Sequence, residues 1–125
     1  MRKALAEDAF EGVPGLAKRL STEASNAAVG DHPQRGLLAG LAQSAKAIAA
    51  GEDAEPDLLR KHFGEVSRHV VQLVSQAPAL QEGRHVFECP MAQGYGRWVQ
   101  KEATMANPYM GKKMLQCGTA VSWGS

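Results

Sequence analysis

The chain has 125 residues, of which 44% are hydrophobic and 22% charged, and its formal net charge is +1. A chain of this size fits one globular domain, spanning residues 1–125, with a modest core of its own. Its 14 basic and 13 acidic residues nearly balance, which leaves no electrostatic footprint for nucleic acid or an anionic membrane. No apolar run approaches the roughly 20 residues that span a bilayer. We therefore expect a soluble protein with no nucleic-acid partner and no membrane insertion.

The first eight residues bear on the compartment. Arg2 and Lys3 give a basic start, but Glu7 and Asp8 follow at once, without the apolar run of roughly 7 to 15 residues that a secretory signal contains. We expect either a cytosolic chain or a periplasmic chain whose signal peptide has been removed. The opening reads like the interior of a helix, which favours the trimmed form.

Two helical patterns open the chain. Residues before Pro14 are predicted to form a short first helix. Apolar residues then recur at intervals of three and four, which predicts a second, amphipathic helix. Its apolar stripe consists of Leu16, Leu20, Ala24 and Ala27 or Ala28.

Two longer patterns follow, at about residues 34–50 and 56–77. The first is rich in alanine and glycine, and such small residues allow a neighbouring helix to approach closely. The second begins with Pro56 at a favourable first helical position and ends before Pro78. Its apolar stripe contains Leu59, Phe63, Val66, Val70, Leu73 or Val74, and Ala77.

The expected fold class is mainly α. Short connections between consecutive amphipathic helices favour antiparallel neighbours, so residues 1–77 are predicted to form an up-and-down bundle of three to four helices. Residues 78–125 are rich in glycine, proline and methionine and show no sustained helical period. We expect this irregular segment to pack on the bundle, since a long unpinned loop is costly in conformational entropy.

Sulfur is concentrated in the irregular segment. Its two motifs are Cys89-Pro90-Met91 and Met114-Leu115-Gln116-Cys117, which contain both cysteines of the chain. Thiolate and thioether ligands select soft metals, Cu(I) above all and also Ag(I). Cys89 and Met91 could reach one ion from a turning backbone, and Met114 and Cys117 would share a face of a helical turn. The sequence therefore predicts a soft-metal site made of Cys89, Met91, Met114 and Cys117.

The same segment resembles a known family in four separated blocks. They are Cys89-Pro90-Met91-Ala92, Gly96-Arg97-Trp98-Val99-Gln100, Asn107-Pro108-Tyr109-Met110-Gly111 and Met114-Leu115-Gln116-Cys117-Gly118. These blocks are similar, in the same order, to those of a domain found at the C-termini of some heavy-metal efflux periplasmic adaptor proteins and as stand-alone periplasmic proteins. The helical part before them, including Leu59 to Ser67, is similar as well. Met110 stands where the family commonly has an aromatic residue, and Val99 stands where it commonly has leucine.

The resemblance implies a periplasmic protein that binds copper or silver in metal export or tolerance. Its expected partners are the metal ion and a heavy-metal efflux assembly or copper chaperone. A second hypothesis from the residues alone is a metal-free interaction module, stapled by a Cys89–Cys117 disulfide that closes a loop of about 27 residues and contributes about 3 kcal/mol. The neighbouring methionines favour the metal.

Catalysis has little support in the sequence, and we expect no enzyme. A cysteine nucleophile needs a histidine base, and His85 is the only histidine near Cys89 in the chain. Phosphate-binding loops, His-Glu-x-x-His motifs and paired Cys-x-x-Cys motifs do not occur in the sequence.

Overall fold

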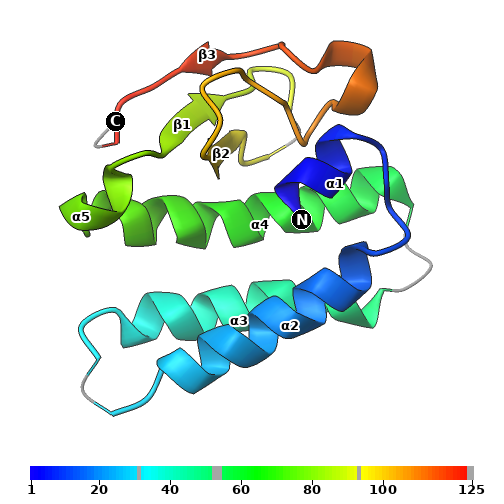
Figure 1. Cartoon of the computed structure of the whole chain (residues 1–125). Helices are drawn as coiled ribbons and strands as arrows, with labels where there is room; N and C mark the ends of the chain where they lie inside the picture. The colour runs from blue at the N-terminus through cyan, green and yellow to red at the C-terminus, as the bar shows by residue number, and fades with distance from the viewer. Residues whose placement is uncertain (31, 52–54, 93, 124–125) are drawn as a thin grey trace.

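The computed structural model describes residues 1–30, 32–51, 55–92 and 94–123. Its helices are α1 (Arg2–Ala6), α2 (Val13–Ala27), α3 (Arg35–Ala50), α4 (Pro56–Ser75) and α5 (Pro78–Gln81), and η1 (Gly111–Met114) is a 3-10 turn (Figure 1). The strands are β1 (His85–Glu88), β2 (Arg97–Gln100) and β3 (Thr119–Ala120). The predicted mainly-α class is confirmed. None of the described helices is long and apolar enough to cross a membrane.

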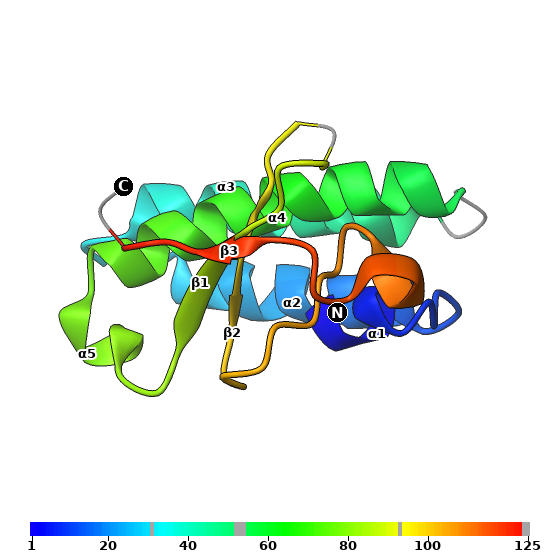
Figure 2. The same ribbon diagram turned by 90° about the horizontal axis from the view of Figure 1, so that it is seen from above.

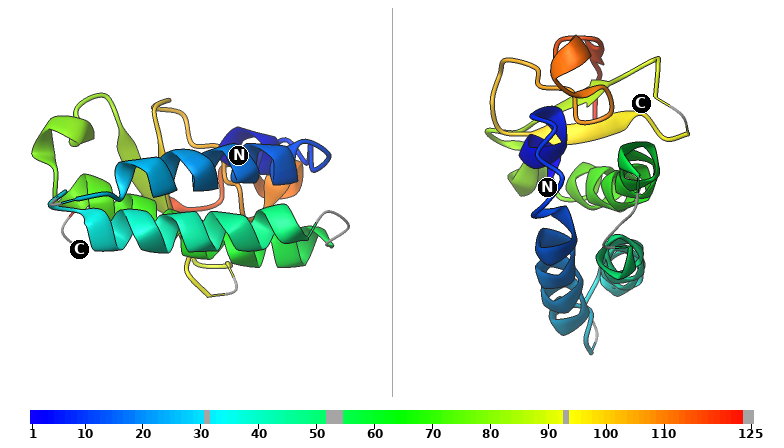
Figure 3. Two further views of the ribbon diagram at one scale, coloured as in Figure 1. Left: turned by 90° about the horizontal axis from the view of Figure 1, so that it is seen from below. Right: turned by 90° about the vertical axis from the view of Figure 1, so that its right-hand side faces the viewer.

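The three long helices pack in sequence order, α2 against α3 and α3 against α4. In the right-hand view of Figure 3, α3 is seen nearly end-on, and α4 lies between it and the strands. In α4 the predicted stripe is buried, through Leu59, Phe63 and Val66. In α2 the predicted Leu16 is exposed, and the buried face is formed by Val13, Ala17 and Ala24. A Cβ at Gly40 on α3 would collide with the His69 ring on α4, so glycine is required there for the two helices to approach this closely.

Helix α4 is the middle layer of the molecule. In Figure 1 it lies between α3 on one side and the strands on the other, and it contacts both α3 and β2. Burial of Phe63 and Gly64 reflects this position. On the strand side, the hydroxyl of Ser67 donates a hydrogen bond to the carbonyl oxygen of Arg97, which joins α4 to β2 directly.

The C-terminal segment contains regular structure that the sequence analysis missed. Residues 85–88, 97–100 and 119–120 form an antiparallel sheet in the order β2-β1-β3, so the prediction of a wholly irregular segment was wrong. Figure 2 shows β1 and β2 crossing over the axis of α4. In the register, Phe87 pairs with Trp98 on one side and with Ala120 on the other. Trp98 is fully buried, and its ring packs at 5.5 Å from that of Phe87.

Polar contacts tie the rest of this segment to the helices. Arg60 of α4 donates to the carbonyl oxygens of Leu5 and Pro108, both at 3.0 Å, and pairs with the carboxylate of Asp8 at 2.6 Å. The second carboxylate oxygen of Asp8 accepts the backbone N–H of Lys112 in η1 at 3.1 Å. The segment before α2 and the segment around η1 are thus held on the same end of α4.

Candidate metal centre

The sheet brings the two cysteines together. Cys89 directly follows β1, and Cys117 lies two residues before β3. The β1–β3 register pairs Glu88 with Thr119, so its continuation sets Cys89 opposite Gly118 and beside Cys117. Cys89 is among the groups that raise the pKa of the Cys117 thiol, and both thiols are free. The sheet therefore brings together two cysteines that lie 28 positions apart in the sequence.

Glycines on either side allow the backbone to come this close. Gly118 has a φ of 144°, and a Cβ there would lie 2.6 Å from the carbonyl oxygen of Glu88. A Cβ at Gly96 would lie 2.5 Å from the carbonyl oxygen of Cys89. Real Cβ atoms do not approach this closely, so each position needs glycine. The amide of Cys89 donates to the carbonyl of Gly96 at 2.8 Å, which closes the turn between β1 and β2.

Asn107 fixes the other cysteine. Its side chain is fully buried, and its amide nitrogen donates to the carbonyl oxygen of Cys117 at 2.6 Å. Its amide oxygen accepts the backbone N–H groups of Tyr109 at 2.8 Å and of Met110 at 3.2 Å. The sequence analysis did not assign Asn107 to the site. An asparagine before proline indicates a local turn, but the bond to Cys117 depends on the tertiary fold.

Burial controls the protonation of the site. Desolvation raises the pKa of the Cys117 thiol, and the neighbouring Cys89 raises it further. Desolvation also raises the pKa of Tyr109 well above its usual value, and its hydroxyl donates to the carbonyl of Arg97 at 2.6 Å. A thiol with a raised pKa is protonated at neutral pH. Because a soft metal binds the thiolate, its binding here must displace the Cys117 proton.

The two predicted thioether ligands lie at the surface. Met91 follows Cys89 by two residues and is 62% exposed, and Met114 at the end of η1 is 38% exposed. The carbonyl oxygen of Met114 accepts the amide of Cys117 at 3.1 Å, so that turn places both residues of the second motif on one short piece of backbone. Cys89 itself is only 3% exposed. The sulfur motifs therefore extend from the buried Cys89 and the half-buried Cys117 to the exposed thioethers.

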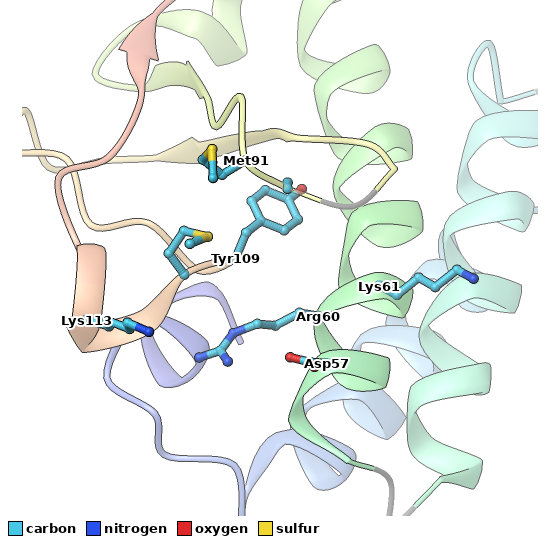
Figure 4. Close-up of a pocket in the computed structure, with 8 residues that line it drawn as sticks. Asp57, Arg60, Lys61, Met91, Tyr109 and Lys113 are labelled. Atoms are coloured by element: carbon cyan, nitrogen blue, oxygen red, sulfur yellow. The ribbon is translucent and has the colours of Figure 1, made fainter.

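Two further methionines belong to the same C-terminal segment. Met105 and Met110 are partly buried against the core cluster that includes Cys89, as is Cys117. The sulfur of Met105 lies 3.1 Å from where a Cβ of Gly118 would stand, next to Cys117 in the chain. Met110 lines a surface hollow together with Met91 (Figure 4).

Other donor types are sparse around the thiols. His85 occupies the far end of β1 from Cys89, about 13 Å away along an extended strand. Its ring stacks on Phe87 with the centroids 6.1 Å apart. Among residues 1–30, 32–51, 55–92 and 94–123, no three His, Cys, Asp or Glu side chains converge to hold a metal ion. The two cysteines, which the sheet brings together, supply soft donors of the kind that suits a soft monovalent ion.

Comparisons of the chain with family models, with curated proteins and with solved structures found no match. The chemistry of the site therefore has to be inferred from its residues.

Proposed function

We propose that this protein binds Cu(I), or Ag(I), as cargo in the periplasm and acts in copper handling, efflux or tolerance. Cys89 and Cys117 are the thiolate ligands, and Met91 and Met114 complete the sulfur set. The observation that carries the proposal is the adjacency of the two cysteines, whose backbone positions the β1–β3 pairing brings side by side. Two thiolates suffice for Cu(I), which accepts low coordination numbers and favours soft donors.

The helical part serves this site as a scaffold. In the proposal, α2, α3 and α4 form an up-and-down bundle, and α4 holds the strand layer through Ser67 and Arg60. The protein is then a binding protein and not an enzyme. It passes the ion to or from a heavy-metal efflux assembly or a copper chaperone, which recognises the exposed edge of the site where Met91 and Met114 lie.

A thiol substitution with a matched control tests the proposal. Cys89→Ser should abolish tight Cu(I) binding in a competition titration against a chromophoric chelator, while circular dichroism shows the helices intact. The control is Cys89→Ser combined with Ser25→Cys, which restores the number of thiols at an exposed position on α2. If tight binding survives Cys89→Ser, or returns in the control, adjacent thiols are not the ligands.

The same adjacency favours a second candidate, a metal-free interaction module stapled by a Cys89–Cys117 disulfide. Closing this loop would stabilise the fold by about 3 kcal/mol on the chain-entropy estimate. Counting free thiols in protein isolated without reductant separates the two candidates. Two free thiols that are protected by added Cu(I) support the metal site, whereas no free thiol and no metal uptake support the staple.

A further inference from the structure

A hollow of about 330 Å³ lies at the surface between α4 and the loop leading into η1. Its walls include Asp57, Arg60, Met91, Tyr109, Met110 and Lys113. Figure 4 shows Met91 near Tyr109 at one end of the hollow, and Arg60 and Asp57 at the other. Ala92, which also lines it, donates its backbone N–H to the carbonyl oxygen of Cys89 at 3.4 Å. A backbone hydrogen bond therefore connects the wall of this hollow to Cys89, whose thiol is buried.

From this arrangement we infer an outer binding position for the same soft ion, formed by the thioethers of Met91 and Met110. The inference rests on the proposed function, since it describes where the ion binds before it reaches the thiols. Met91 is common to both positions. An ion held by Met91 and Met110 can pass to the thiols by exchanging one ligand at a time, without release into water.

The donor set suits this assignment. Two methionines from different loops line one open hollow, and their thioethers are neutral, so they bind a soft ion without losing a proton. Methionine is unbranched and flexible, which allows both sulfur atoms to adapt to one ion. The backbone of Met110 is fixed, because its N–H donates to the buried Asn107 side chain at 3.2 Å. A hollow several times larger than a water molecule leaves room for the remaining ligands of the ion.

The surrounding charges do not oppose a monovalent cation. The guanidinium of Arg60 is paired with the carboxylate of Asp8 at 2.6 Å, which offsets its charge. Asp57 contributes a negative charge to the wall, against the positive charge of Lys113. Lys61 also borders the hollow, but Figure 4 shows its side chain extending away from Met91 and Tyr109. The wall is therefore close to neutral where the thioethers lie.

The outer position can be tested without the thiols. We would titrate chloride-free Ag(I), a redox-inert stand-in for Cu(I), into full-length Cys89→Ser/Cys117→Ser protein carrying ¹³C-labelled methionine methyl groups. The methyl signals of Met91 and Met110 should shift together and saturate at one ion per chain. Adding Met110→Leu should lower the Ag(I) affinity about tenfold or more, as expected for loss of a direct ligand. The matched control, Met105→Leu, changes a methionine that neither lines the hollow nor belongs to the proposed ligand set, and it should leave the affinity unchanged.

Two results would overturn the inference. One is a titration in which the Met91 and Met110 signals stay in place, and the other is an equal loss of affinity in Met110→Leu and Met105→Leu. If the double variant fails to fold, the same titration is made with labelled Cys89→Ser protein, in which the paired thiolate site is already broken. Failure of the thiol site itself would appear separately, as absence of tight binding in the wild-type protein.

Discussion

Asn107 organises the backbone around the thiols. Its side chain joins the carbonyl of Cys117 to the amides of Tyr109 and Met110, and it has no exposed surface. A buried amide with all of these partners stabilises one conformation, because every competing arrangement leaves some polar group unpaired. The position of Cys117 beside Cys89 therefore depends on a residue that does not itself bind the ion.

Replacing this side chain should weaken both fold and site. Asn107→Ala leaves two buried amides and one carbonyl without their partner, and we expect a loss of about 2–4 kcal/mol in the free energy of unfolding, measured by urea denaturation. Cu(I) affinity should fall as well. Asn26→Ala, at an exposed position of α2, is the control and should change stability by less than about 0.5 kcal/mol. If the two substitutions lower the free energy of unfolding equally, the buried side chain of Asn107 does not have this structural role.

The raised pKa of Cys117 predicts how metal binding depends on pH. Below that pKa the thiol is protonated, and binding the ion releases its proton, so the apparent Cu(I) affinity should rise with pH. Each proton released contributes a tenfold change per pH unit. Competition titrations between pH 5 and 8 measure this slope, and Cys117→Ser should lower it by one proton. Binding that is independent of pH would argue against thiolate ligation.

At the scale of elements, a single carboxylate holds η1 against the helices. Asp8 accepts the N–H of Lys112 and pairs with Arg60, and these contacts lower its pKa below the usual value of 3.8, the hydrogen bond from Arg60 most of all. A carboxyl group whose pKa is lower in the folded state stabilises the fold above its unfolded pKa. That contribution is lost as the pH falls below about 4 and the group becomes protonated.

Asp8→Asn tests this contact. Asn tolerates the positive φ of 57° that Asp8 adopts, so the substitution removes the charge and leaves the backbone conformation accessible. Since Asp8 is partly exposed, we expect a modest loss of about 0.5–1 kcal/mol at neutral pH, reduced by salt. The difference from wild type should vanish near pH 2. A difference that persists at that pH would show that the carboxylate charge is not responsible.

The contact between α3 and α4 gives a prediction with an internal control. Gly36→Ala and Gly40→Ala both place alanine in α3, where alanine favours the helix by up to about 1 kcal/mol. Gly36 has open space around its Cα, whereas a Cβ at Gly40 meets the His69 ring. In thermal unfolding, the midpoint temperature of Gly36→Ala should therefore equal or exceed that of the wild type, and that of Gly40→Ala should be lower. If Gly40→Ala is as stable as Gly36→Ala, the helices do not pack this closely.

The helices could be predicted from the sequence because their stripes are long and regular. Predicted ranges of about 34–50 and 56–77 correspond to α3 (Arg35–Ala50) and α4 (Pro56–Ser75). The strands were missed for physical reasons. In β1, the consecutive Val86 and Phe87 are both buried, and in β2 the buried partner of Trp98 is the polar Gln100, so neither shows an apolar alternation. Strand β3 has only two residues.

The site was predictable in part for a similar reason. The spacing of cysteine and methionine predicted that Cys89 and Cys117 share one site. The pairing of β1 with β3 places these two residues on neighbouring backbone. Local spacing did not reveal the hollow shared by Met91 and Met110, because Tyr109 and the α4 side chains that complete it meet only in the folded chain. Ligation by Cys89, Met91, Met114 and Cys117 stays a prediction.

At the scale of the whole molecule, the fold has a helical layer and a strand layer with α4 between them (Figure 1). The buried ring of Trp98 and the ion pair of Asp8 with Arg60 hold the strand layer in place, so the thiols are positioned before any ion arrives. Binding to a site that is already formed costs little conformational entropy. We therefore expect Cu(I) to leave the helix content unchanged.

The most direct test of this account is an anaerobic titration of the fully reduced protein with Cu(I) against a chromophoric competing chelator, with free thiols counted before and after. We predict one ion bound tightly per chain, with both thiols protected from alkylation. Failure to compete with the chelator, with both thiols still reactive, would contradict the account.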